Sequence, residues 1–103
     1  MIRILVNYSN GKFESMEIKG HANSGDYGKD VVCAGVSSVF IGGLNNLEEP
    51  ESFDIRIEEG DSSIQLRKGK TLKAHDEIVL ETIIVSLKTI AESYPKNVII
   101  SEN

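Results

Sequence analysis

The chain has 103 residues, of which 40% are hydrophobic and 26% charged, and its formal net charge is −5. These values predict one soluble globular domain with a single core. The acidic balance argues against direct nucleic-acid binding, which needs a basic face, and no apolar run is long enough to cross a membrane. The N-terminal residues lack the features of a signal peptide, so we expect a cytoplasmic protein.

The first residues predict a β-hairpin. Residues 2–8 alternate between apolar and polar side chains, a pattern typical of a strand. Its apolar face is formed by Ile2, Ile4, Val6 and Tyr8. Asn10-Gly11 follows, a strong turn signal because both central residues of such a turn need positive φ. Residues 13–19 are then the return strand.

A loop and a helix follow the hairpin. Residues 20–30 contain three glycines and several small polar residues, which predicts a mobile loop. A helical pattern begins at Val31, and Asp30 is suited to cap it because its carboxylate can accept free amide hydrogens of the first turn. The helix contains three costly glycines, Gly35, Gly42 and Gly43. We favour close packing on a sheet over a ligand approaching the backbone as their explanation.

The second half of the chain repeats this order. Residues 53–57 and 64–66 form a second hairpin around the turn at residues 59–62. A long helix is expected from Asp76, as its cap, to Tyr94. Residues 98–100 add a short last strand. The order β-β-α-β-β-α-(β) predicts an α+β domain spanning residues 1–103, with a mostly antiparallel sheet of four to five strands and two helices.

Residues 48–61 carry seven carboxylates and one arginine. A solvated loop and a half-exposed strand are the simpler explanation for this composition. The functional alternative is an acidic surface that attracts a basic substrate.

Two residues near the first loop, Cys33 and His21, could be catalytic. Cys33 is the only cysteine, so it forms no internal disulfide and belongs to no cysteine-based zinc set. As the third residue of the predicted helix, it lies where the helix dipole favours a thiolate and lowers the thiol pKa, and where amides could hold an oxyanion. His21 ends the second strand and has a pKa suited to proton transfer at neutral pH. Asp30 opposes a thiolate by its charge, but it could orient an imidazole.

Ordinary structural roles are open for each of these residues. A lone cysteine on a helix is more often part of the core, and a lone histidine after a strand more often lies at the surface. The other histidine, His75, lies beside Asp76 and Glu77 and is expected to be exposed.

A sequence motif favours catalytic roles for Cys33 and His21 over these structural ones. The segments Gly20-His21-Ala22, Gly25, Tyr27-Gly28 and residues 30–37 (DVVCAGVS) resemble the signature of the ribosomal-processing cysteine proteases, G-H-A, a glycine loop and D-[IV]-V-C-A-A-x-S. The departure at Gly35 replaces an alanine of the pattern. The rest of the chain is similar to the family more loosely, in length, acidity and element order.

The resemblance implies a small dimeric bacterial protease. Members of this family remove a short N-terminal extension from a protein of the large ribosomal subunit and need no metal or cofactor. By similarity, Cys33 is the nucleophile and His21 the base and proton donor. Supporting positions in the motif are Asp30, Gly20 and Ser37. The family's loop between His and Cys moves aside for substrate, which here implicates Ser24, Gly25, Tyr27 and Gly28.

Two other functions are compatible with the residues. A non-catalytic factor that binds a basic ribosomal protein would also be acidic. A redox sensor would use Cys33 as a reactive thiol, but it leaves the Gly-His-Ala segment without a role.

Overall fold

The computed structural model describes residues 1–22 and 30–103, and these form five strands and two α-helices. The strands are β1 (Ile2–Ser9), β2 (Lys12–Lys19), β3 (Phe53–Glu58), β4 (Asp61–Leu66) and β5 (Val98–Glu102). The helices are α1 (Val31–Leu44) and α2 (Ala74–Ser93), and a short 3-10 helix, η1 (Pro50–Ser52), precedes β3. The predicted α+β class and element order are confirmed.

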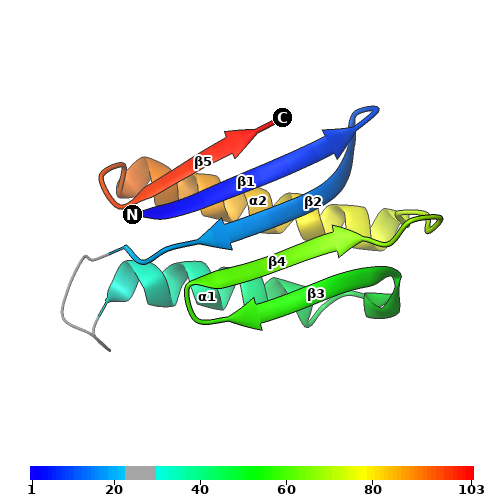
Figure 1. The fold of residues 1–103 in the computed structure, drawn as a ribbon, viewed down its shortest axis with the longest axis horizontal. Coiled ribbons are helices and arrows are strands. Elements are labelled where there is room, and N and C mark those ends of the chain that lie inside the picture. The colour runs from blue at the N-terminus through cyan, green and yellow to red at the C-terminus, as the bar shows by residue number, and fades with distance from the viewer. Residues whose placement is uncertain (23–29) are drawn as a thin grey trace.

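The strands form one sheet in the order β3-β4-β2-β1-β5. The pairs are antiparallel except for β1 and β5, which run parallel. Both helices cover the same face of the sheet (Figure 1). The core lies between these two layers, and the side chains of its strands that are almost fully buried include Ile4, Val6, Met16 and Ile64. The opposite face carries exposed polar residues such as the paired Arg3 and Lys19.

The first hairpin turns where predicted, with φ of 54° at Asn10 and 78° at Gly11. The pairing register shifts between Asn7 and Tyr8. Tyr8 was expected on the buried face but is 36% exposed, because it lies at the rim, where its hydroxyl donates a 2.5 Å hydrogen bond to Glu102.

Helix α1 begins after Asp30, whose carboxylate accepts hydrogen bonds from the amides of Val32 and Cys33. The predicted cap is therefore confirmed. Close packing accounts for one of the helical glycines, although the partner is a helix and not the sheet. A Cβ atom on Gly43 would lie 2.3 Å from the side chain of Ile83 in α2.

Helix α2 begins two residues before the predicted start, and Asp76 does not cap it. The carboxylate of Asp76 is 2% exposed and accepts hydrogen bonds from the amides of Glu48 (2.8 Å) and Glu49 (3.1 Å). The expected cap is wrong because this carboxylate is instead the buried acceptor for two amides of the connection between α1 and η1. Within residues 1–22 and 30–103, no helix has the length and hydropathy to cross a bilayer.

Candidate active site

Three segments meet at one end of the molecule: the residues after β2, the first half of α1 and the β3–β4 turn (Figure 1). Together they line an open cleft of about 340 Å³. His21 and Cys33 both line it, together with Gly60 of the turn. The apolar side chains in its wall are Val36, Phe40, Ile41 and Ile57. The fold thus brings the two predicted catalytic residues into one cleft.

Cys33 is the third residue of α1, as predicted, and is partly buried. The backbone N–H of Ala22 donates a 3.2 Å hydrogen bond to its sulfur. This contact joins the start of α1 to the residue that follows His21. It therefore fixes the position of the thiol relative to the segment that carries the candidate base.

The pKa of the Cys33 thiol is raised, not lowered as expected from the helix dipole. Burial is the main cause, and a hydrogen bond to Asp30 and the charge of its carboxylate raise the pKa further. The Ala22 amide and the N-terminal charge act in the opposite direction. Desolvation and a nearby carboxylate both favour the neutral thiol.

The amides of the first turn of α1 were expected to hold an oxyanion. The N–H groups of Val32 and Cys33 instead donate to the Asp30 carboxylate, each at 3.0 Å, and that of Ala34 donates to the Asp30 carbonyl. The helix cap and the first helical hydrogen bond therefore already use these three amides, and an oxyanion role for them stays a prediction. The Ala22 amide is a donor to the Cys33 sulfur.

His21 follows β2 and is separated from it by Gly20, which has a φ of +98°. A Cβ atom on Gly20 would lie 2.3 Å from the Met1 carbonyl oxygen. Glycine is therefore required at this position for both conformation and space. The Gly20 amide donates to the Gly60 carbonyl at 3.0 Å, and the His21 carbonyl accepts a hydrogen bond from the Met1 amino group. The backbone beside the imidazole is thus held on both sides.

Two residues of the site were not anticipated from the sequence. The side-chain amide of Asn97, in the α2–β5 turn, donates a 2.8 Å hydrogen bond to the Ala22 carbonyl. Gly60 lies against the His21 ring, since a Cβ atom built on it would be 2.9 Å from Nε2. No local signal marks Asn97 in the sequence. Gly60 was predicted as a turn residue, and only its contact was unforeseen.

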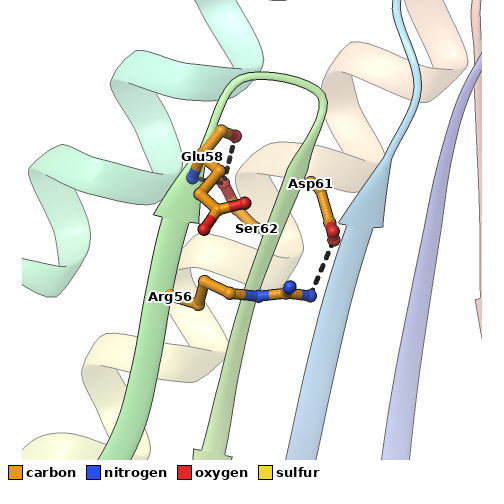
Figure 2. A network of polar contacts seen from close by, with 4 residues as sticks. All are labelled: Arg56, Glu58, Asp61 and Ser62. Atoms are coloured by element: carbon orange, nitrogen blue, oxygen red, sulfur yellow. Dashed lines mark hydrogen bonds and ion pairs between the residues drawn. The ribbon is translucent and has the colours of Figure 1, made fainter.

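The outer wall of the cleft is formed by the β3–β4 hairpin. Figure 2 shows the polar contacts that brace its end. Arg56 donates a 2.9 Å hydrogen bond to Asp61, and the Ser62 hydroxyl accepts one from the Glu58 amide and donates another to the Glu58 carbonyl. Glu58, Glu59 and Asp61 also line the cleft. Residues of the acidic stretch therefore border the candidate site.

The remaining predicted positions are distributed as follows. Ser37 is exposed and lines the cleft one helical turn after Cys33. The predicted loop residues Ser24, Gly25, Tyr27 and Gly28 lie outside the described residues.

His75 lies outside the cleft, with its side chain 40% exposed, 3.6 Å from Glu48 and hydrogen-bonded to the Asn46 carbonyl. In the part of the chain that the structure describes, no group of three or more His, Cys, Asp or Glu side chains could hold a metal ion.

Comparison with known proteins identifies a family. The family model described as "Cysteine protease Prp" matches residues 1–99. The chain is 35% identical over 99 residues to the ribosomal processing cysteine protease Prp of Staphylococcus aureus strain Mu50, covering 94% of this chain and 92% of that protein. It is 30% identical over 110 residues to the Bacillus subtilis strain 168 protein of the same name, covering 100% and 98% respectively.

Solved structures agree with these sequence matches. The S. aureus Prp protease with a covalently linked product peptide superposes with a TM-score of 0.88 at 32% identity. The same protease with a substrate peptide gives a TM-score of 0.82 at 31% identity. Each match covers all of this chain and all of the S. aureus chain.

Proposed function

Because this chain belongs to the Prp family of cysteine proteases, we propose that it removes a short N-terminal extension from a protein of the large ribosomal subunit. Relatives that share 30–35% of their sequence with it are named ribosomal processing proteases. The observation that carries the proposal is the shared cleft, in which the only cysteine of the chain lies beside the segment that bears His21.

The chemistry follows from the neutral state of the thiol. A cysteine whose pKa is raised is a weak nucleophile until a base removes its proton. We assign this role to His21, which takes the proton as the sulfur attacks the scissile carbonyl. The Ala22 amide, which donates to the sulfur, stabilises the thiolate that this proton transfer creates.

The second half of the reaction returns the enzyme to its starting state. His21 protonates the amine of the leaving fragment, so the C–N bond breaks and a thioester forms on Cys33. Water then attacks this thioester, giving a free carboxylate and restoring the thiol. The peptide covalently linked in the S. aureus relative supports a covalent step of this kind.

Supporting roles follow from the contacts. Asp30 caps the helix that carries Cys33, Gly20 lets the chain pass close to Met1, and Ser37 lies in the cleft wall. We keep Ser24, Gly25, Tyr27 and Gly28 as the proposed gate for substrate on the family resemblance alone. A cytoplasmic homodimer is proposed on the same basis, and light scattering of the purified protein tests the dimer.

The experiment is cleavage of a peptide that spans the extension junction of the ribosomal protein, followed by mass spectrometry. A protease yields two fragments from one peptide bond, with many turnovers per enzyme molecule. Binding without turnover would instead support the ribosome-associated binding factor, and rapid peroxide oxidation of Cys33 without turnover would support the redox sensor.

A further inference from the structure

The turn between β3 and β4 makes direct contact with the candidate base. A Cβ atom built on Gly60 would lie 2.9 Å from Nε2 of His21 and 3.3 Å from Cε1. Real side chains almost never come so close, so the imidazole occupies the space that any side chain at position 60 would need. The ring rests on the bare backbone of this turn.

The same turn also holds the chain that carries the imidazole. The Gly60 carbonyl accepts a 3.0 Å hydrogen bond from the amide of Gly20, the residue before His21. Gly60 therefore contacts both the His21 ring and the residue that precedes His21. A displacement of the turn should therefore displace the His21 ring as well.

The turn is braced from within. The Ser62 hydroxyl bonds to both the amide and the carbonyl of Glu58, and Arg56 bonds to Asp61 across the end of the hairpin (Figure 2). These contacts flank Gly60 on both strands. A rigid support of this kind keeps a side chain within the narrow range of positions that catalysis requires.

A need for positive φ does not by itself explain this contact. Gly60 has a φ of +72°, but Gly11 has +78° and Gly69 +83° in two other turns. A Cβ atom on Gly11 or Gly69 would meet nothing within 4 Å. All three glycines therefore have a positive φ, but of the three only Gly60 lies against the His21 imidazole.

We propose that Gly60 is a positioning residue that sets the place of the His21 imidazole relative to Cys33 in the cleft. This inference rests on the proposed role of His21 as the base. A side chain at position 60 pushes the ring away from its support. The reaction then slows at the proton-transfer step, while the rest of the fold is retained.

The test compares Gly60→Ala with the matched variants Gly11→Ala and Gly69→Ala. All three introduce alanine at a positive φ and should lose similar stability in urea unfolding. Only Gly60→Ala should lose kcat/KM for the junction peptide, by about 100-fold, the scale expected when a catalytic group is misplaced by about 1 Å. Should Gly60→Ala not fold, the Asn variants at the same three positions replace it, because Asn tolerates positive φ.

A spectroscopic measurement separates positioning from a general loss of stability. The chain has two histidines, and His75 lies outside the cleft, so its resonances are an internal reference. The ring proton signals of His21 should move in Gly60→Ala and stay in place in the two control variants. Activity of Gly60→Ala within twofold of the controls, or unmoved His21 signals, would overturn the proposal.

The proposed protease function can fail separately. If wild-type protein does not cleave, or if His21→Ala cleaves at the wild-type rate, the role of His21 is wrong whatever Gly60 does. If cleavage depends on His21 but not on Gly60, only the positioning inference is wrong.

Discussion

The backbone amide of Ala22 points at the sulfur of Cys33 and donates a 3.2 Å hydrogen bond to it. This contact ties the proposed nucleophile on α1 to the segment after β2 that carries His21. Ala22 thus supplies a donor to the sulfur, whereas the amides of Val32 and Cys33 donate to the Asp30 carboxylate.

Asn97 is expected to maintain this contact, since its side chain holds the Ala22 carbonyl at 2.8 Å. Asn97→Ala should cost about 1 kcal/mol of unfolding free energy and lower kcat/KM for the junction peptide. Asn97→Asp should be at least as harmful because its carboxylate faces a carbonyl. Asn103→Ala removes a 3.2 Å bond to Asn7 at the other end of the sheet and is the control. Equal activity in Asn97→Ala and Asn103→Ala would contradict this role.

The Asp30 carboxylate should control the ionisation of Cys33. Asp30→Asn keeps a side chain that caps helices well but removes the negative charge that raises the thiol pKa. We expect the pKa of Cys33 to fall, so alkylation by iodoacetamide at pH 7 becomes faster and its midpoint moves to lower pH. An unchanged or higher midpoint would show that the carboxylate does not oppose the thiolate.

The raised pKa of Cys33 also determines how the stability of the fold depends on pH. The pKa of Cys33 in the folded state is raised above its ordinary value of 9.0, so folding favours the protonated thiol. This contribution is fully present below pH 9.0 and is lost as the pH rises through the folded pKa. Unfolding measured across this range should show a smaller alkaline loss in Asp30→Asn than in the wild-type protein.

The carboxylates at the outer wall should favour a basic substrate. Glu58 and Glu59 line the cleft, and both are exposed. Glu59→Gln should raise KM for a lysine-containing junction peptide, and added salt should reduce the difference, because these are surface charges. The same peptide with glutamine for lysine should show little change.

Glu14→Gln is the control for this experiment, because it removes one exposed charge near the first hairpin turn. An equal rise in KM for Glu14→Gln would mean that net charge, and not the wall of the cleft, determines the preference.

Two adjacent glycines of α1 should respond oppositely to alanine. A Cβ atom on Gly42 meets nothing within 4 Å, so Gly42→Ala should gain up to about 1 kcal/mol from helix propensity. A Cβ atom on Gly43 would lie 2.3 Å from Ile83, so Gly43→Ala should lose about 1–3 kcal/mol as α1 and α2 separate. Urea unfolding measures both values, and a stable Gly43→Ala would show that the helices can adjust.

Features decided by neighbouring residues could be predicted from the sequence. The Asn10-Gly11 turn depends on the conformational preferences of two residues, and the Asp30 cap on amides two and three positions away. The alternation in β1 and the helical period of α1 and α2 set the element order for the same reason. The placement of Cys33 in the first helical turn followed directly from the cap.

Features decided by distant contacts could not be predicted in this way. Asn97 reaches Ala22 across 75 positions, and Asp76 reaches Glu48 and Glu49 across 28 and 27. Asp76 was predicted as a helix cap because aspartate is common both at helix caps and as a buried hydrogen-bond acceptor, so the residue type does not distinguish the two roles. The thiol pKa was predicted in the wrong direction because burial depends on the packing of α1, which no local pattern reveals.

The most direct test of the central claim is the rate at which Cys33→Ala cleaves the junction peptide. The variant removes one sulfur atom at a partly buried position, and urea unfolding confirms that it folds. We expect cleavage to fall to background in Cys33→Ala, and His21→Ala to lose at least about 100-fold in kcat/KM, the scale of general-base catalysis. Cleavage by folded Cys33→Ala at the wild-type rate would show that the cysteine is not the nucleophile.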